Sequence, residues 1–262
     1  MRAFAFGLAA SAALAGAAEA APRRVVSLNL CTDEYLLMLG APEQIVSVSH
    51  LARQRAETPL WRRGRRYPAN DGSLVSVAPL RPDLVLTMGG GARDRLRIAG
   101  RLGIRTLDLP YPQRLADIES HLTQVAKALG RPLAGEMLRR RIERLRRTAP
   151  AQSVETIWLG GGGRSVAVHG LGAEWMALAG MRQRALQGDR VSLEQLLSQP
   201  PALLLRSNYR AGQYSGEQKW LQHPLARGAR RVRSIATDGR RWTCMGPAMI
   251  SEIERLRRVI RR

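Results

Sequence analysis

Short apolar, β-branched runs alternate along the chain with segments whose apolar residues recur at helical spacing. This alternation is typical of parallel sheets whose strands are connected by crossover helices. In the first half it predicts strands at 25–28, 44–48, 84–87 and 104–107, and helices at 35–39, 93–102 and 114–129. Gly40, Gly103 and Gly130 stand where these helices should end.

A long helical segment separates this half from the next. Pro132 suits the first turn of a helix, and the segment 133–147 then continues with Gly135 as its one weak point. Its apolar residues recur near helical spacing while arginines cover the rest, so one stripe should pack and the other should meet water. After it the pattern predicts strands at 155–159, 202–206 and 231–235, helices at 174–179, 193–197 and 248–260, and strand character at 164–168.

We therefore predict an α/β protein of two parallel-sheet lobes joined by a single long interlobe helix, with the ligand cleft between the lobes. The expected boundaries are 21–130 for the first lobe, 131–149 for the interlobe helix and 150–262 for the second lobe.

The first twenty residues predict a signal peptide. A cationic start at Met1-Arg2 is followed by an apolar, alanine-rich stretch over 3–18, and Ala18-Glu19-Ala20 fits the small-x-small rule for cleavage. We expect export, to the periplasm if the source is a Gram-negative bacterium.

Composition changes this picture little. The 262 residues carry 42 Lys plus Arg against 21 Asp plus Glu, a net charge of +21. Lys127 and Lys219 are the two lysines, so nearly all of the excess is arginine, a skew that favours coding bias over selection for phosphate contacts. Together with export, this argues against nucleic acid as a partner, and we expect a monomer.

The two cysteines, Cys31 and Cys244, each fall in a predicted cleft loop, one in each lobe. Three interpretations are open: unpaired thiols that are simply buried, a disulfide across the ligand entrance, or thiolates that contact a metal. We favour unpaired thiols, with the disulfide second.

In open parallel sheets, ligands collect beyond the carboxyl ends of the strands. The loops at those ends supply the candidate ligand-binding residues. They are Asn29, Cys31, Thr32, His50, Met88 and Gly89 in the first lobe, and Arg164, Tyr209, Arg210, Trp242 and Cys244 in the second.

Several of these residues have a simpler interpretation. Thr32 and Asp33 precede a predicted helix, where capping is the expected role of both. For His50 we weigh ligand contact against ordinary packing. Tyr209 and Trp242 stand beside arginines, and that combination suits an anionic ligand that contains a ring.

The sequence contains no recognisable catalytic or cofactor-binding motif. The glycine run at 89–91 lacks the G-x-G-x-x-G pattern, and the run at 160–163 is followed by a strand-like segment instead of a helix. No serine has a G-x-S-x-G setting. The four histidines are scattered without a close pair. We expect no catalytic residue, no cofactor and no directly bound metal ion.

Three segments in this order, Arg24 to Glu34, Leu39 to Ser49 and Leu80 to Leu86, carry a resemblance to a known family. With weaker support from 191–197 and 222–225, the chain resembles the periplasmic substrate-binding proteins of ATP-driven (ABC) importers for cobalamin and iron-siderophore chelates. The resemblance covers nearly all of the chain after residue 20.

The resemblance implies a receptor that delivers its ligand to an ABC transporter permease in the inner membrane. It also implies that one surface glutamate on each lobe docks to the permease. Glu194 matches in the second lobe, whereas the first-lobe position falls on Val75, with Asp71 as a nearby acidic alternative. The cleft positions that hold large aromatics in cobalamin receptors fall near Leu51, Ala69 and Met88.

The expected ligand is therefore a metal chelate or corrinoid: a ferric siderophore, cobalamin, or haem held through His50 or Tyr209. An anionic ferric chelate would make the best use of the arginines. Two other hypotheses stay open, an exported enzyme that acts at the same cleft and a polyanion-binding module that uses the arginine surface.

Overall fold

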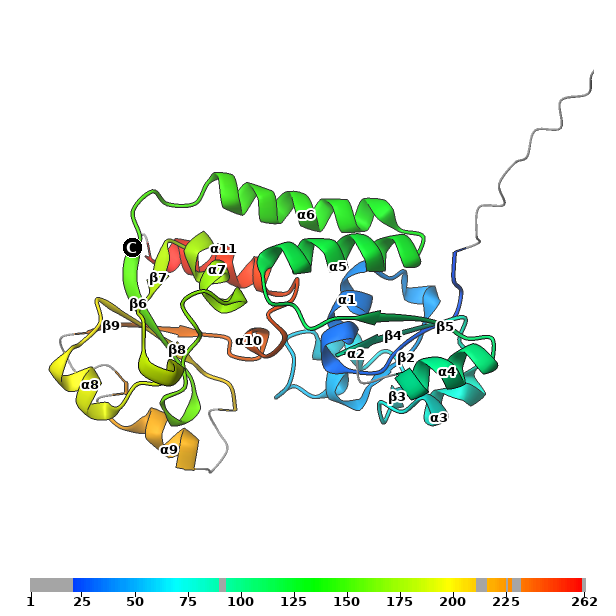
Figure 1. Ribbon diagram of the computed structural model, residues 1–262, viewed down its shortest axis with the longest axis horizontal. Helices are drawn as coiled ribbons and strands as arrows, with labels where there is room; N and C mark the ends of the chain where they lie inside the picture. The colour runs from blue at the N-terminus through cyan, green and yellow to red at the C-terminus, as the bar shows by residue number, and fades with distance from the viewer. Residues whose placement is uncertain (1–20, 90–92, 211–215, 225, 228–231, 261–262) are drawn as a thin grey trace, which may run out of the picture.

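The computed structural model describes residues 21–89, 93–210, 216–224, 226–227 and 232–260. The segment expected to be a signal peptide lies outside these residues. The described chain forms two separate parallel sheets with helices packed on them, as predicted (Figure 1).

The first sheet has the strand order β3-β2-β1-β4-β5, and all of its pairs are parallel. We call this sheet with its helices α1 to α4 the first lobe. Its strands are β1 (Val25–Ser27), β2 (Ile45–Ser49), β3 (Ala69–Asn70), β4 (Leu84–Met88) and β5 (Arg105–Leu109), and its helices are α1 (Leu30–Leu39), α2 (Trp61–Gly64), α3 (Leu74–Val77) and α4 (Arg93–Arg101).

The chain passes to the second sheet through α5 (Leu115–Ala128) and α6 (Pro132–Arg147). The second sheet has the order β7-β6-β8-β9 and is also parallel. We call it, with α7 to α11, the second lobe. Its elements are β6 (Val154–Leu159), α7 (Leu171–Leu178), β7 (Met181–Gln183), α8 (Leu193–Ser198), β8 (Leu203–Ser207), α9 (Gly216–Gln222), β9 (Arg233–Thr237), α10 (Arg241–Cys244) and α11 (Met249–Ile260).

The central strands are buried on both faces because helices cover both. Successive side chains of a strand point to opposite faces, and Leu84 and Leu86 of β4 accordingly join one apolar cluster while Val85 joins another. In the second lobe Leu204 of β8 faces a third cluster, with α8 and α9. Such near-continuous apolar runs are what central parallel strands require.

The largest apolar cluster is shared by the two lobes. It contains Leu36 of α1 and Leu122 of α5 from the first half of the chain, and Trp175 of α7 and Ile253 of α11 from the second. Figure 1 shows α5 on the side of the first sheet and α11 on the side of the second, with α6 lying above them. Helix α6 packs on α5 and on α11, and Ile142 on its apolar stripe is fully buried. That a single interlobe helix joins the two lobes stays a prediction.

One predicted strand is wrong. Residues 164–168, which follow Gly163, are irregular and form no strand. They make a single β-bridge, between Arg164 and Arg190. Gly162 and Gly163 both have positive φ, at 63° and 75°, and turn the chain away from β6. The segment therefore crosses the mouth of the second lobe instead of adding to its sheet.

Candidate functional site: a cleft between the lobes

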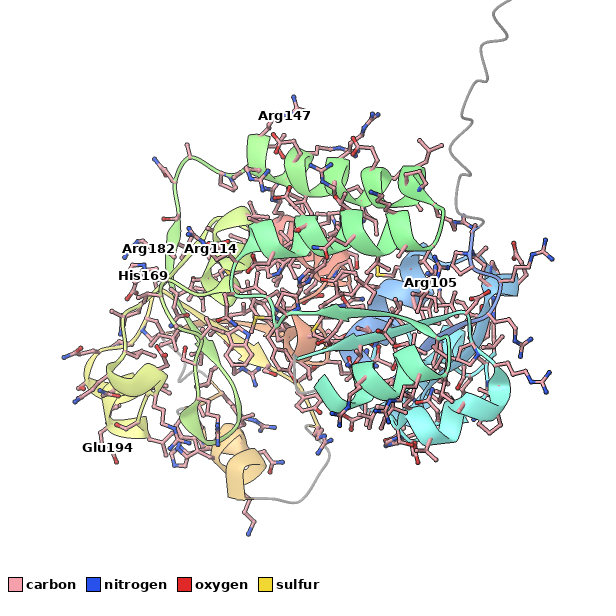
Figure 2. All side chains as sticks on the ribbon, turned by 45° about the vertical axis from the view of Figure 1, so that its right-hand side comes forward. Arg105, Arg114, Arg147, His169, Arg182 and Glu194 are labelled. Carbon is pink, nitrogen blue, oxygen red and sulfur yellow. A yellow bond between two sulfur atoms is a disulfide. The ribbon has the colours of Figure 1, made fainter. Side chains whose placement is uncertain are left out.

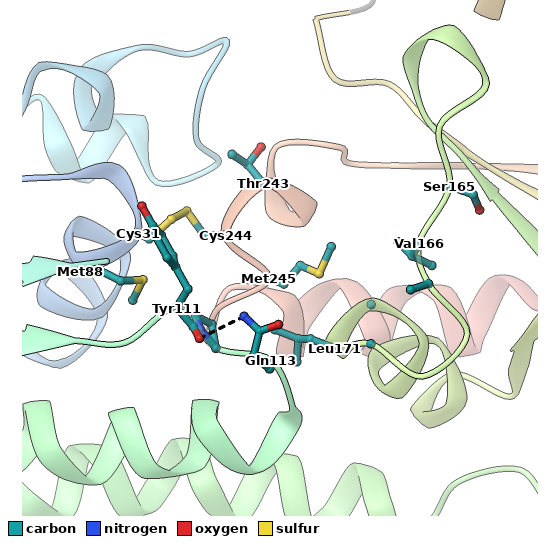
Figure 3. Close-up of a pocket in the computed structure, with 14 residues that line it drawn as sticks. Cys31, Met88, Tyr111, Gln113, Ser165, Val166, Leu171, Thr243, Cys244 and Met245 are labelled. Atoms are coloured by element: carbon teal, nitrogen blue, oxygen red, sulfur yellow. Dashed lines mark hydrogen bonds between the residues drawn. A yellow bond between two sulfur atoms is a disulfide. The ribbon is translucent and has the colours of Figure 1, made fainter. Parts of the chain in front are cut away.

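A cleft between the lobes consists of two adjoining pockets. The first has a volume of about 330 Å³ and the second about 340 Å³, within the usual range for small-molecule sites. They share Ser165, Val166, Thr243 and Met245. The first pocket is completed by Cys31, Met88, Tyr111, Pro112, Gln113, Ala167, Gly170, Leu171, Gly172 and Cys244, and the second by Trp158, Gly160, Gly161, Arg164, Ser207, Tyr209, Gly239 and Trp242 (Figure 3).

Sheet topology explains this location. In each sheet the strand order reverses between two neighbouring strands, β1 and β4 in the first lobe and β6 and β8 in the second. The loops beyond the carboxyl ends diverge at such a point and leave a crevice. Cys31 follows β1 and Met88 ends β4, while Gly160 follows β6 and Tyr209 follows β8. The two crevices face each other.

Cys31 and Cys244 form a disulfide, and their Cα atoms lie 5.3 Å apart. The interpretation as unpaired thiols, which we favoured from the sequence, is therefore wrong. Cys31 lies in the first turn of α1 and Cys244 is the last residue of α10, so the bond joins the two lobes. Both residues line the first pocket, and the disulfide forms part of its wall (Figure 3).

The cap of α1 is Asn29, and the expected capping role of Thr32 and Asp33 is wrong. The Asn29 side chain accepts from the backbone N–H groups of Cys31, at 3.1 Å, and Thr32, at 3.0 Å. Thr32 and Asp33 lie inside the helix and are buried. Asp33 reaches β2, where its carboxylate accepts from the Ser49 N–H at 3.0 Å and from the Ser49 hydroxyl at 2.5 Å. Burial nevertheless raises the pKa of Asp33 to about 6.

Glu34 holds the second lobe against α1 close to the disulfide. Its Oε1 accepts the backbone N–H of Ala248 at 2.6 Å. Gly246 is needed for this approach, since a Cβ there would lie 2.6 Å from the same oxygen. Glu34 is buried, and burial raises its pKa to about 7. The carboxyl group is thus a titratable contact between the lobes.

Tyr111 is a cleft residue that sequence reasoning missed. It follows β5 at the carboxyl end of the sheet, is 63% exposed and lines the first pocket. The ring lies over Gly89, whose φ is 110° and where a Cβ would come within 2.8 Å of the ring. The absence of a side chain at Gly89 is therefore what allows the Tyr111 ring to lie there. Gln113 donates to the Tyr111 carbonyl at 3.3 Å and supports the turn (Figure 3).

In the second lobe Trp158 and Trp242 form the aromatic wall of the cleft, with ring centroids 5.5 Å apart. Trp242 is fixed from behind, because its indole N–H donates to the Thr237 hydroxyl at 2.7 Å. Trp242 is 4% exposed, so its part of this wall is held in place before any ligand binds.

Tyr209 and Arg210 join the first lobe through Glu57. The Tyr209 hydroxyl donates to Glu57 Oε2 at 2.7 Å, and Arg210 Nη2 donates to Oε1 at 2.8 Å. Burial, together with the Glu57 carboxylate, raises the pKa of Tyr209. Arg240 adds a third contact by donating to the Arg55 carbonyl at 2.8 Å. One edge of the cleft is thus closed by polar contacts between the lobes.

Charge is scarce in the cleft. Among the described residues that line the two pockets, Arg164 is the one charged side chain. The other arginines near the second-lobe loops have partners elsewhere: Arg206 donates to Ser234, Arg240 is paired with Asp238, and Arg210 with Glu57. The arginines that stand beside Tyr209 and Trp242 in the sequence therefore do not line the cleft.

The candidate residues therefore divide into two groups. Six line the cleft: Cys31, Met88, Arg164, Tyr209, Trp242 and Cys244. Five stand behind or beside it: Asn29, Thr32, His50, Gly89 and Arg210. His50 is exposed in the short 3₁₀ turn after β2. No group of three or more His, Cys, Asp or Glu side chains that could hold a metal ion occurs among the described residues.

The expected docking positions lie on the outer surface of the lobes. Glu194 is exposed in the first turn of α8, and Figure 2 shows it far from Arg147 on α6. Val75 on α3 is 79% exposed. Asp71 accepts from the Ser76 hydroxyl at 2.6 Å, and hydrogen bonds from Ser76 and Ser73 lower its pKa to about 2. The docking role of Glu194 stays a prediction.

Comparison with known proteins identifies the class. Residues 25–234 match the family described as "Periplasmic binding protein", and the chain belongs to that family. A search of curated protein sequences finds no match. Within the described part of the chain, no helix has the length and apolar character that crossing a membrane requires.

Solved structures of periplasmic binding proteins share the fold. The periplasmic heme binding protein HutB of Vibrio cholerae has a TM-score of 0.70 at 16% identity, covering 90% of this chain and 98% of its own. The heme-binding protein RhuT from Roseiflexus sp. RS-1 has 0.66 at 23% identity, covering 90% and 96%. The vitamin B12 binding protein BtuF of Vibrio cholerae has 0.61 at 18% identity, also covering 90% and 96%.

Proposed function

We propose that this protein captures a metal chelate or corrinoid in the periplasm and delivers it unchanged to an ABC transporter permease. The observation that carries the proposal is the cleft, which both lobes line and which is walled by apolar and aromatic side chains. Membership of the periplasmic binding protein family supports a solute-binding role. The structural neighbours named above bind heme or vitamin B12.

Within that class, the chemistry of the cleft favours a large ring with little charge. Burial of apolar ligand surface against Met88, Val166, Leu171 and Met245 favours binding. A highly anionic chelate would lose its hydration in the cleft and gain only one cationic partner, the guanidinium of Arg164. Haem and cobalamin therefore fit this wall better than a strongly anionic ferric siderophore. The carboxylates of haem would find one matching cation in Arg164.

Direct iron coordination has candidate donors in the same pocket. The Tyr111 hydroxyl, the Met88 thioether and the Met245 thioether all border the first pocket (Figure 3), and phenolate and thioether groups are known haem ligands. His50 does not line the pocket, so we no longer assign it a role as a haem ligand. The Tyr209 hydroxyl already donates a hydrogen bond to Glu57, so Tyr209 is not our preferred haem ligand either.

Titration of intrinsic fluorescence with haem, cobalamin and a ferric siderophore tests the proposal. Trp158 and Trp242 line the second pocket, so a ligand there should quench emission. We expect one of the ring ligands to bind with a Kd well below 100 μM. If every member of the panel binds more weakly than about 100 μM, near −5.5 kcal/mol, the proposed transport role loses its support.

A further inference from the structure

A third pocket lies between the lobes and shares no lining residue with the cleft. Its volume is about 330 Å³. The first lobe contributes Met38, Pro59, Leu60, Arg62 and Arg63, and the second contributes Arg241, Ala248 and Ser251. The pocket uses another part of α10 than the cleft does, because Arg241 lines it whereas Thr243 and Cys244 line the cleft.

Arg241 is held in a fixed position in this pocket. Its Nη1 donates to the Ala248 carbonyl at 2.6 Å and to the Ser251 hydroxyl at 2.8 Å. Its Nε is buried and makes no hydrogen bond to the described residues. The carboxylates of Asp238, at 3.5 Å, and Glu252, at 3.9 Å, lie beyond good hydrogen-bond range of that nitrogen. An oriented cation, whose charge these two carboxylates offset only in part, therefore borders the pocket.

No carboxylate among the described residues pairs with either of the two first-lobe arginines. Arg63 Nη1 donates to the Leu37 carbonyl at 3.3 Å, and the Arg62 guanidinium lies 4.7 Å from the Trp61 ring centroid. Neither forms an ion pair within the described part of the chain. No acidic side chain is among the described residues that line the pocket.

Three guanidinium groups around one polar hollow repel each other, and an anion between them relieves that repulsion. Guanidinium groups donate in a planar fork that matches the oxygens of phosphate, sulfate and carboxylate. We propose that this pocket binds an oxyanion, either free or as part of a larger molecule. This inference does not rest on the proposed cargo of the cleft.

The position of the pocket gives such an anion a structural effect. Arg62 and Arg63 come from the first lobe, and Arg241 and Ser251 from the second. An anion bound to both sets bridges the lobes and stabilises their present arrangement, by mass action on the native state. A bound anion therefore raises the melting temperature as well as occupying the site.

Calorimetric titration of the full protein with inorganic phosphate tests the proposal, in a buffer free of phosphate and sulfate and at constant ionic strength. We expect saturable binding of one phosphate with a Kd below roughly 10 mM, or of acetate if the site prefers a carboxylate. The variant Arg62→Ser/Arg63→Ser should weaken this binding at least tenfold and abolish the rise in melting temperature.

The control Arg65→Ser/Arg66→Ser removes the same charge from neighbouring exposed residues that do not line the pocket. It should keep the affinity within twofold. Circular dichroism of both double variants checks that they fold. Failure of both phosphate and acetate to bind saturably, or an equal loss of affinity in the two double variants, would overturn the proposal.

Discussion

Cys31 at the start of α1 is bonded to Cys244 at the end of α10, so a covalent link crosses from one lobe to the other inside the ligand cleft. Glu34 lies one helical turn further along α1 and accepts the Ala248 N–H. The shared apolar cluster continues behind these contacts. A movement that opens the cleft must therefore pivot about the disulfide instead of separating the lobes.

Reduction of this disulfide should lower stability. The cysteines are 213 residues apart in sequence, and closing a loop of that length removes roughly 5 kcal/mol of chain entropy from the unfolded state, of which 2–4 kcal/mol is typically realised. We expect a melting temperature several degrees lower in reductant. The double variant Cys31→Ala/Cys244→Ala should melt at that lower temperature with or without reductant. A wild-type protein insensitive to a reductant that demonstrably opens the bond would contradict this.

Glu34 should make stability fall as the pH rises. Its folded pKa, raised by burial to about 7, exceeds its ordinary value of 4.5, so between these pH values the native state holds a proton that the unfolded chain has lost. The free energy of unfolding then declines across this window by an amount on the order of 3 kcal/mol. Asp33, with its pKa raised to about 6, contributes a decline of the same sign between about pH 4 and 6.

The variant Glu34→Gln keeps an acceptor for the Ala248 N–H and removes the titration, so its decline should be shallower. Urea unfolding at pH 5, 6, 7 and 8 measures the difference, with the exposed Glu43→Gln as control. Parallel curves for wild type and Glu34→Gln would show that this carboxyl group does not govern the pH dependence.

Loss of Glu57 should weaken the edge of the cleft. Glu57 is 5% exposed, and its carboxylate accepts from both Tyr209 and Arg210. Glu57→Ala leaves the Tyr209 hydroxyl without its acceptor, and we expect a cost of about 2 kcal/mol. Tyr209→Phe removes one of the two bonds and should cost about 1 kcal/mol. Denaturant unfolding compares them; equal stability of all three proteins would mean that the contact contributes nothing.

Arg164 should select for a carboxylate on the ligand. It is the one charged side chain among the described cleft residues, so Arg164→Ala should weaken haem binding about tenfold, near 1.4 kcal/mol, and leave the binding of neutral cobalamin within twofold. Arg147→Ala on α6 removes the same charge at an exposed site outside both pockets and should change neither affinity. An identical loss for both ligands in Arg164→Ala would argue against charge recognition.

The strand pattern could be read from the sequence because buried parallel strands are continuous apolar runs. Strands β1, β4, β6 and β8 were all predicted within a residue or two of their observed bounds. The edge strands β3 and β7 were missed. They have two and three residues, Ala69–Asn70 and Met181–Gln183, and neither is an apolar run.

The details of the site depended on tertiary structure. Cys31 can pair with Cys244 only when both lobes are in place. The two residues are 213 positions apart, so no local sequence pattern indicates the pairing. Three polar residues could have capped α1, and the backbone conformation selected Asn29. Tyr111 carried a usable signal, because it follows a predicted strand at the carboxyl end of the first sheet. The partners of the arginines followed no single rule: Arg210 pairs with Glu57 of the other lobe, whereas Arg240 pairs with Asp238 two residues away.

The most direct test of the cleft as the cargo site is calorimetric titration of wild type and a matched pair of variants with haem, cobalamin and a ferric siderophore. Ala167→Arg places a long side chain in the first pocket, which Ala167 lines. Ala177→Arg places the same side chain on the exposed face of α7, outside both pockets. We predict that haem or cobalamin binds wild type with one-to-one stoichiometry, that Ala167→Arg weakens this at least tenfold, and that Ala177→Arg stays within twofold. Binding that is equally strong in all three proteins would place the cargo elsewhere and contradict the account.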